Sequence, residues 1–173
     1  MQEVKLRKLQ ENDLTALVKH ANNKKIWSNL RDMFPHPYSE SDGRNFITIT
    51  QDDEKNYRFA ITYGGHFAGM IGLFPQTDVY KYNAEIGYWL GEEFWGKGVA
   101  TRAVQQIVEF GFKETEIQRI FAGIFAFNTP SMRVLEKNGF TKEGLHTRAV
   151  FKDNAFYDEV KYAIVKSKPG ELS

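Results

Sequence analysis

One segment near the middle of the chain constrains the fold more than any other. Residues 84–103, AEIGYWLGEEFWGKGVATRA, lead from an apolar stretch through a short loop into a long helical pattern. The loop carries Gly96-Lys97-Gly98 where the helix predicted over residues 96–112 begins. The apolar side of that helix is formed by Ala100, Ala103, Val104, Ile107, Val108 and Phe110. A strand that passes through a glycine turn into an amphipathic helix indicates a layered fold of strands and helices.

Similar patterns along the chain predict further strands and helices. The predicted strands cover residues 3–9, 57–63, 66–74, 85–90, 119–127, 140–151 and 156–165. Further helices are predicted after Asn12 or Asp13, in part of 24–38, and over residues 39–51 and 129–138. Gly64-Gly65 and Asp153-Asn154 are typical of hairpin turns. This order indicates an α+β or α/β layer built on one mixed sheet.

The composition excludes several classes of function. A formal net charge of +1 is too balanced to favour nucleic acid or an anionic membrane as the main partner. The absence of cysteine excludes a disulfide framework, a thiolate metal site and a cysteine nucleophile, and we expect no metal. The N-terminus has no signal-peptide pattern and no run is long enough for a membrane span, so we expect a cytoplasmic protein. The polar tail, residues 167–173, is expected to be frayed.

The two glycines of the central loop favour an anionic ligand. They allow the backbone N–H groups of residues 96–101 to point into one concavity, and the N-terminus of the following helix adds partial positive charge. A pyrophosphate fits that arrangement, with Lys97 either adding a cation or solvated. The spacing matches neither a P-loop nor the GxGxxG of a dinucleotide fold, since position 101 is Thr. A plain helix N-cap with a glycine turn stays open as the alternative.

Several spaced motifs together resemble one enzyme superfamily. Trp95-Gly96-Lys97-Gly98-Val99-Ala100 is similar to the acetyl-CoA signature of the GNAT superfamily, Gln/Arg-x-x-Gly-x-Gly/Ala. Trp95 stands where many members have Gln or Arg, a departure that is usual in the RimJ/RimL branch of ribosomal-protein N-terminal acetyltransferases. The other motifs that resemble this branch are Leu6-Arg7 with Asn12-Asp13-Leu14, residues 84–90, Asn128-Thr129-Pro130-Ser131 and Glu136-Lys137-Asn138-Gly139-Phe140. The resemblance extends over residues 3–166.

The resemblance implies a fold, a cosubstrate and a reaction. We expect a single GNAT-like α+β domain over residues 1–173, with a mixed, mostly antiparallel sheet of about seven strands flanked by about four helices. The implied reaction is direct transfer of the acetyl group of acetyl-CoA to a primary amine. The residues expected at acetyl-CoA are Trp95, Gly96, Lys97, Gly98, Val99, Ala100 and Thr101 around the pyrophosphate, and the backbone of Tyr88, Trp89 and Leu90 along the pantetheine. In the family this strand separates from its neighbour at a bulge, which Gly87 would suit.

Two side chains are candidates for the proton transfers that such a reaction needs. A primary amine is mostly protonated near neutral pH, so a base must remove a proton before the amine attacks. The resemblance assigns this role to Glu85, and the alternative is a strand-edge Glu paired with Lys or Arg. Ser131 is the candidate proton donor to the CoA thiolate, because Leu135 occupies the position where many members have Tyr. The alternative for Ser131 is a residue that only caps its helix.

Two further residues are candidates for contacts to acetyl-CoA. The amide of Asn128 is expected to hold the pantetheine arm, as the family's Asn does, although an Asn at a strand-to-helix junction is also a good helix cap. Arg133, together with Lys137, is expected near the adenosine 3′-phosphate. Solvated helix charges are the alternative for both.

The acceptor amine is expected to bind against the irregular stretch 24–38. Trp27, Phe34 and Tyr38 supply aromatic walls there. Arg31 is a candidate for binding a carboxylate or a peptide backbone. Phe151, from the closing hairpin, is expected to line the other side.

The residues leave several functions open. A protein or peptide N-terminal amine is the first candidate acceptor, and a small-molecule amine such as an amino acid, a polyamine or an antibiotic is the second. A catalytically idle acetyl-CoA-binding module and a structural partner with a vestigial pocket are the alternatives to an enzyme. Relatives of this branch are commonly monomers or dimers, so we expect a monomer or a homodimer.

Overall fold

One sheet of seven strands runs through the molecule, whose computed structural model describes residues 2–167. The strands lie in the order β1-β2-β3-β4-β5-β7-β6, and every neighbouring pair is antiparallel except the parallel pair β4–β5. Their bounds are β1 Val4–Arg7, β2 Tyr57–Tyr63, β3 His66–Pro75, β4 Asn83–Leu90, β5 Arg119–Phe125, β6 Thr141–Lys152 and β7 Ala155–Val165. The predicted mixed, mostly antiparallel sheet is confirmed. The tail prediction lies, apart from Ser167, outside the described residues.

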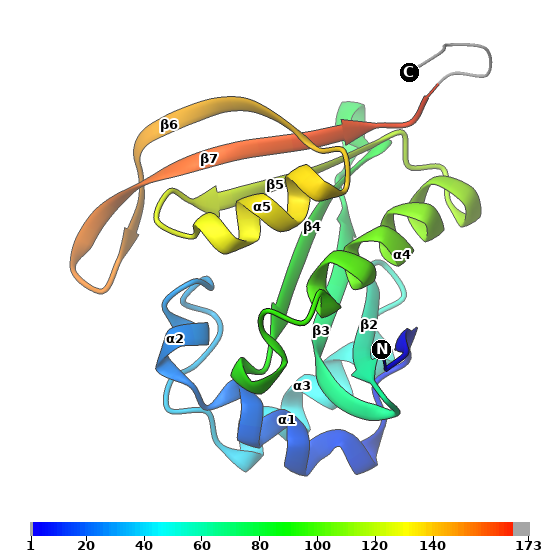
Figure 1. The fold of residues 1–173 in the computed structure, drawn as a ribbon, viewed down its shortest axis with the longest axis vertical. Coiled ribbons are helices and arrows are strands. Elements are labelled where there is room, and N and C mark those ends of the chain that lie inside the picture. Colours follow the sequence, from blue (N-terminus) through cyan, green and yellow to red (C-terminus); the bar gives the residue numbers. More distant parts are fainter. Residues whose placement is uncertain (1, 168–173) are drawn as a thin grey trace.

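Helices cover both faces of this sheet, as Figure 1 shows. Their bounds are α1 Leu14–Ala21, α2 Lys24–Trp27, α3 Glu40–Asp52, α4 Val99–Glu114 and α5 Thr129–Lys137. Helices α4 and α5 share a core with Ile86 and Ile120 on one face. Helices α1 and α3 pack on the other face, around Leu17 and Ile47. The four longer helices agree with the predicted number, and α2 adds a single turn. Within residues 2–167 no helix is long and apolar enough to cross a membrane.

The beginning of α4 differs from the sequence prediction. The helix begins at Val99 instead of residue 96, because Gly98 has a φ of 71°, in the left-handed region that a right-handed helix does not contain. Gly96 has a φ of 73°, so both glycines belong to the loop that leads into the helix. The C-terminal end lies at Glu114 instead of residue 112.

Strands β4 and β5 are joined only where they begin. The parallel ladder pairs residues 83–85 with residues 119–121 and then ends. Beyond Glu85, β4 stays paired with β3 while β5 stays paired with β7, so the two strands separate. The β3–β4 ladder has no register shift, so the bulge expected at Gly87 was a wrong prediction, although the expected separation is present. The facing edges of β4 and β5 therefore offer backbone groups that lack a strand partner.

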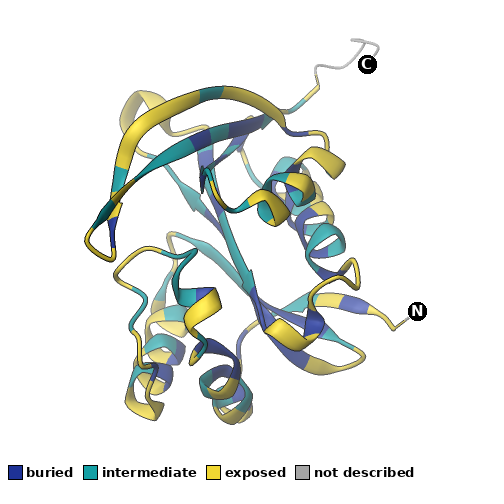
Figure 2. Ribbon diagram, turned by 60° about the vertical axis from the view of Figure 1, so that its left-hand side comes forward, coloured by how far each residue is buried: buried dark blue, intermediate teal, exposed yellow. Residues whose placement is uncertain are grey.

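The exposed edge strand β6 bends toward the other half of the molecule. Figure 2 shows that β6 is exposed along most of its length. Its ladder with β7 shifts register twice, and at the second shift the Arg148 N–H donates to Asp158 Oδ1 at 2.7 Å. Asp153 and Asn154 both have positive φ and form the turn at the tip of this hairpin. The tip lies near α2 (Figure 1), which places Phe151 and Lys152 beside the irregular stretch 24–38.

Helix α5 depends on one fully buried side chain, Leu135, which is 0% exposed. We expect Leu135→Ala to lower the free energy of unfolding by about 2–5 kcal/mol, because the neighbouring core cannot fill the cavity. Lys137→Ala, at an exposed position of the same helix, should change it by less than about 0.5 kcal/mol. Urea unfolding followed by circular dichroism measures both variants. Equal stabilities would show that α5 does not need this contact.

Candidate active site

The loop before α4 presents an open cradle of backbone donors. Gly96 and Gly98 both have positive φ, and a Cβ built on either would meet no atom within 4 Å. Glycine is therefore required here by conformation, while the space in front of the loop is free. Among the described residues no side chain caps α4, whose N-cap is Gly98. The N–H groups of its first turn are available to an anion, so the loop fits the predicted pyrophosphate.

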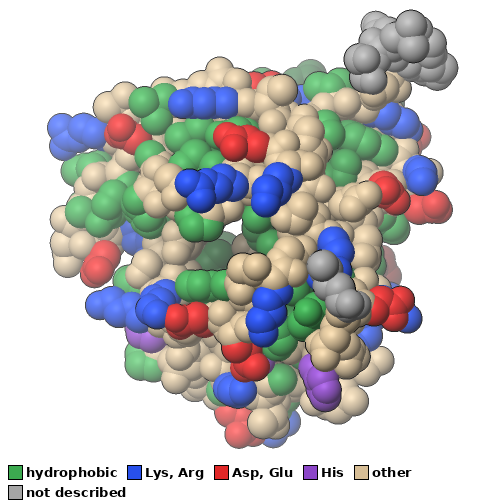
Figure 3. Space-filling view, in the orientation of Figure 1, with side chains coloured by type: hydrophobic (Ala, Val, Ile, Leu, Met, Phe, Trp, Pro, Cys, Tyr) green, Lys and Arg blue, Asp and Glu red, His purple; other side chains and the backbone are tan. Residues whose placement is uncertain are grey.

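Basic side chains surround the space in front of this cradle. Figure 3 shows a hollow at the centre of the molecule, between α5 and the loop before α4, with Lys and Arg side chains on both sides. Arg133 and Lys137 are exposed on α5, and neither forms an ion pair with another residue in the described part of the chain. Lys97 is exposed in the loop, and its carbonyl accepts a hydrogen bond from Arg102 at 3.3 Å. Exposed basic residues therefore lie on both elements that border this hollow, α5 and the loop before α4.

A short turn over Glu92–Phe94 and the ring of Trp95 fix the loop in place. Trp95 Nε1 donates to the Leu90 carbonyl at 2.9 Å, so this carbonyl, expected to meet pantetheine, already has a partner. Glu92 accepts hydrogen bonds from Asn23 at 2.8 Å and from Lys25. The pyrophosphate loop is thus tied to the start of the stretch that was expected to bind the acceptor. The sequence gives no signal for these pairs, since the partners lie far apart along the chain.

The side chains of β4 alternate between the two faces of the sheet. Ile86 and Tyr88 contact the core under α4 and α5, whereas Trp89 contacts the core on the side of α1 and α3. Glu85 lies four residues before Trp89, so its side chain points to the same face of the sheet, the side of α1 and α3. The gap between β4 and β5 thus has a candidate base on one face and the Tyr88 phenol on the other.

The Tyr88 side chain contacts the start of α5. Its hydroxyl lies 2.7 Å from Ser131 Oγ, so the two hydroxyls share a hydrogen bond. Burial raises the pKa of Tyr88 to about 12, against a smaller opposite effect of the Ser131 hydrogen bond, so the phenol stays protonated at neutral pH. From the sequence only the backbone of Tyr88 was expected to function. A contact between residues 43 positions apart leaves no trace in local patterns.

Glu85 and Arg31 are brought together by the fold. Arg31 Nη2 donates to Glu85 Oε1 at 2.5 Å. The Glu85 side chain is 18% exposed, while that of Arg31 is 66% exposed. The candidate base and a candidate acceptor contact therefore share one ion pair. This ion pair is also the alternative stated for Glu85, so the role of Glu85 as base stays a proposal.

Asn128 caps α5 with its side-chain oxygen. Asn128 Oδ1 accepts from the Ser131 N–H at 3.3 Å, which is the capping role considered as the alternative. A pantetheine carbonyl would be met by the nitrogen of the same amide, so the cap orients that nitrogen. Both Asn128 and Ser131 thus belong to the first turn of the helix on the Tyr88 face.

Two of the predicted aromatic walls occupy different environments. The Phe34 ring packs against Tyr38 and Trp89, with centroid separations of 5.1 and 5.8 Å. Tyr38 is only 4% exposed, and burial raises its pKa to about 12. Tyr38 is therefore a core residue that supports Phe34, not the exposed wall expected from the sequence, because the chain turns inward into α3 at this point.

A buried lysine joins the hairpin tip to the stretch 24–38. Lys152 is 3% exposed; its Nζ pairs with Asp32 Oδ1 at 2.8 Å and lies 3.9 Å from the centroid of the Trp27 ring. Trp27 therefore acts as the base of a cation–π contact. Phe151, next to Lys152, is 58% exposed and packs on Phe156 at 4.9 Å. Lys152 was not predicted, since a lysine on an edge hairpin is ordinarily solvated.

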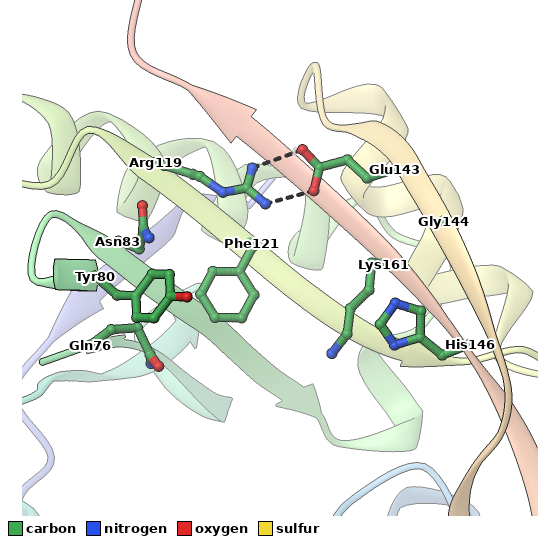
Figure 4. Close-up of a pocket in the computed structure, with 9 residues that line it drawn as sticks. All are labelled: Gln76, Tyr80, Asn83, Arg119, Phe121, Glu143, Gly144, His146 and Lys161. Carbon is green, nitrogen blue, oxygen red and sulfur yellow. Dashed lines mark hydrogen bonds and ion pairs between the residues drawn. The ribbon is translucent and has the colours of Figure 1, made fainter.

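A trough of about 450 Å³ lies on the face of the sheet that Glu85 occupies. Figure 4 shows the Phe121 ring at its centre, between Tyr80 on one side and Lys161 on the other. Phe121 is the register partner of Glu85, so the trough lies next to the strand that carries the candidate base. The sequence gives no hint of this trough, because it combines side chains from five separate segments.

The charges around the trough are paired. Arg119 donates to both carboxylate oxygens of Glu143 at 2.9 and 2.6 Å, at one end of the trough in Figure 4. Lys161 pairs with Glu159 at 2.6 Å. Nowhere in the described chain do three or more His, Cys, Asp or Glu side chains gather as they would around a metal ion.

Solved structures with this fold contain coenzyme A. An acetyltransferase for microcin C7 self immunity, MccE, was solved with acetyl-CoA and AMP; it is 27% identical, has a TM-score of 0.82 and matches 95% of this chain and 93% of its own. RimL, the ribosomal L7/L12 α-N-protein acetyltransferase, was solved with coenzyme A; it is 24% identical, with a TM-score of 0.82 over 94% of this chain and 93% of its own, and shows the fold alone.

Relatives known by sequence carry related names. The uncharacterized N-acetyltransferase p20 of Bacillus licheniformis is 33% identical over 81% of this chain and 80% of its own. YdaF of Bacillus subtilis, named only provisionally as a ribosomal N-acetyltransferase, is 34% identical over 61% of this chain, and the match spans 57% of its length. The spermidine N(1)-acetyltransferase of Escherichia coli K12 is 25% identical over 93% of this chain and 85% of its own.

The loop glycine tests the cradle. We expect Gly98→Val to raise the Kd for acetyl-CoA at least about tenfold, because a β-branched residue resists positive φ and the donor loop is distorted. Gly65→Val is the matched control: Gly65 also has positive φ with no atom within 4 Å of a built Cβ, but it lies in the β2–β3 turn. Calorimetric titration of both variants measures the Kd. Equal affinities in the two variants would refute the cradle.

A family model joins these observations. The model described as an acetyltransferase (GNAT) domain matches residues 3–141, most of the chain. The matched region contains the parted strands, the glycine loop and the Tyr88–Ser131 contact, and acetyl-CoA is the acetyl donor of the family. The chain therefore belongs to the GNAT family of acetyltransferases, as an N-acetyltransferase domain that takes acetyl-CoA as cosubstrate.

Proposed function

We propose that the acceptor is the α-amino group of a peptide or protein N-terminus. The observation that carries this proposal is the trough around Phe121, the register partner of Glu85, because its aromatic floor and paired charges suit an uncharged chain that continues from the reacting amine. Gln76 and Asn83, which also line it, supply amide groups for a peptide backbone. The names of RimL and YdaF, both tied to ribosomal proteins, agree with this acceptor class.

In this proposal Glu85 receives the proton of the acceptor amine. Glu85 lies at the last pair of the β4–β5 ladder, where the gap begins, and its register partner Phe121 lines the trough. A carboxylate there can hold the ammonium group and then take its proton, directly or through one water. Acetyl-CoA supplies the thioester whose carbonyl the neutral amine attacks.

The Tyr88–Ser131 pair acts on the opposite face. Ser131 Oγ can donate a proton to the departing thiolate and receive one from the Tyr88 phenol, 2.7 Å away. A serine hydroxyl alone is a poor acid, whereas the phenol is the stronger acid of the two. The base and the acid thus act from opposite faces of the gap.

A polyamine is the second candidate acceptor, favoured by the match to a spermidine N(1)-acetyltransferase over 93% of this chain. Long polyamines carry several cations and need carboxylates that are free to pair with them. The carboxylates nearest the trough, Glu143 and Glu159, already pair with Arg119 and Lys161. Because these carboxylates are already paired, we place the polyamine second to the peptide as the acceptor. We keep the cytoplasm as the proposed location.

An acceptor screen tests the proposed class. The protein and acetyl-CoA are mixed with short peptides that have free N-termini, the same peptides N-acetylated, spermidine and single amino acids. Free CoA thiol is then followed with a thiol reagent, which the chain itself cannot consume because it has no cysteine. We expect release with free N-termini and none with blocked ones. CoA release with spermidine alone would refute the peptide acceptor. No CoA release with any acceptor would favour an idle acetyl-CoA-binding module.

Replacing Glu85 tests its role as base. We expect Glu85→Gln to lower kcat by about 10²–10⁴-fold while the Kd for acetyl-CoA stays unchanged, since the amide cannot accept the proton. The remaining rate should rise with pH as more of the amine becomes neutral. Glu40→Gln is the matched control, because it removes another Arg–Glu ion pair on an exposed helix. Similar kcat values in both variants would exclude Glu85 as the base.

A further inference from the structure

The two partners of the Glu85–Arg31 ion pair are held very differently. Glu85 is 18% exposed and fixed on β4, whereas Arg31 is 66% exposed and lies in an irregular stretch. An exposed, long side chain is held weakly by such a pair, so Arg31 can be displaced at little cost. Glu85, being mostly buried, still needs a positive partner when Arg31 leaves. A guanidinium stays protonated and does not react, so it occupies the ammonium position without consuming the acetyl donor.

An α-amino group with its own carbonyl fits between these two partners. The amine nitrogen and the carbonyl oxygen of one residue are about 3 Å apart, with the donor and the acceptor side by side. Arg31 and Glu85 present the complementary groups, a donor and an acceptor in contact at 2.5 Å. One acceptor terminus can therefore replace a single ion pair by two interactions, ammonium to Glu85 and carbonyl to Arg31.

An amine without a neighbouring carbonyl cannot make this exchange. It displaces Arg31 from Glu85 and offers the exposed guanidinium no new oxygen partner, so it gains one interaction where the peptide terminus gains two. The neighbouring Asp32 carboxylate does not help, because it already pairs with Lys152 at 2.8 Å. On the basis of the proposed peptide acceptor, we propose that Arg31 is a specificity-determining residue that binds the α-carbonyl oxygen of the acceptor and thereby favours peptide N-termini over polyamines.

The test compares two acceptors across matched variants. The acceptors are Ala-Ala-Phe amide and spermidine, and the readout is the ratio of their kcat/KM values, which cancels any general loss of activity. We expect Arg31→Ala to lower kcat/KM for the peptide about ten- to hundredfold and to leave the value for spermidine within about threefold. Arg31→Glu should shift the ratio further toward spermidine, because a carboxylate can pair with its second ammonium. Arg44→Ala, which removes a similarly exposed paired arginine on α3, should not change the ratio.

The possible outcomes separate this inference from the proposed function. A wild-type protein that uses the peptide, with a ratio unchanged in Arg31→Ala, would overturn the role of Arg31 alone. A wild-type protein that prefers spermidine would overturn the peptide acceptor and this inference together. If turnover is too slow to follow, calorimetric Kd values of both acceptors for the CoA-bound protein give the same ratio. Failure of the peptide to bind wild type would then overturn both.

Discussion

The rest of the candidate site depends on the separation of the parallel strands β4 and β5. β4 and β5 share only the ladder of residues 83–85 with residues 119–121, and each then follows its other neighbour. A sheet that stays closed would satisfy these backbone groups internally. Here they are free to pair with an extended ligand, and we propose that the glycine loop at the end of β4 receives the charged end of that ligand. The alternation of side chains along β4 then assigns Glu85 to one face and Tyr88 to the other.

Much of the fold followed from local patterns, whereas the side-chain pairs of the site did not. Strand alternation and helix caps predicted the elements, and α3, predicted over residues 39–51, is found at Glu40–Asp52. The start of α4 was wrong by three residues, because glycines in a helical pattern do not reveal their φ (residue 96 predicted, Val99 found). The Tyr88–Ser131 and Arg31–Glu85 contacts span 43 and 54 positions, beyond any local signal. Burial of Tyr38 was likewise missed, since an aromatic residue beside prolines suits a pocket wall and a core equally.

Contacts between the two halves of the molecule link the loop for the donor with the stretch proposed for the acceptor. Glu92, just before the glycine loop, accepts from Asn23, and the stretch that begins there reaches Lys152 through Asp32. Lys152 is buried and paired, so removing one partner would leave an uncompensated charge. These long-range pairs hold three separate segments around the gap. They attach the irregular stretch 24–38 to the strands and the loop that carry the rest of the candidate site.

The two faces of the gap between β4 and β5 also bear on the kinetic mechanism. In the proposed arrangement the glycine loop and α5 receive the donor on one face while the acceptor binds on the face of Glu85 and the trough, so neither reactant blocks the entrance of the other. Direct transfer in this arrangement requires both reactants to be bound together, which predicts sequential kinetics with a ternary complex. CoA can then leave on the donor side, and the acetylated acceptor on the acceptor side. An inhibitor that joins a CoA fragment to an acceptor fragment would have to pass between β4 and β5, and would occupy both entrances at once.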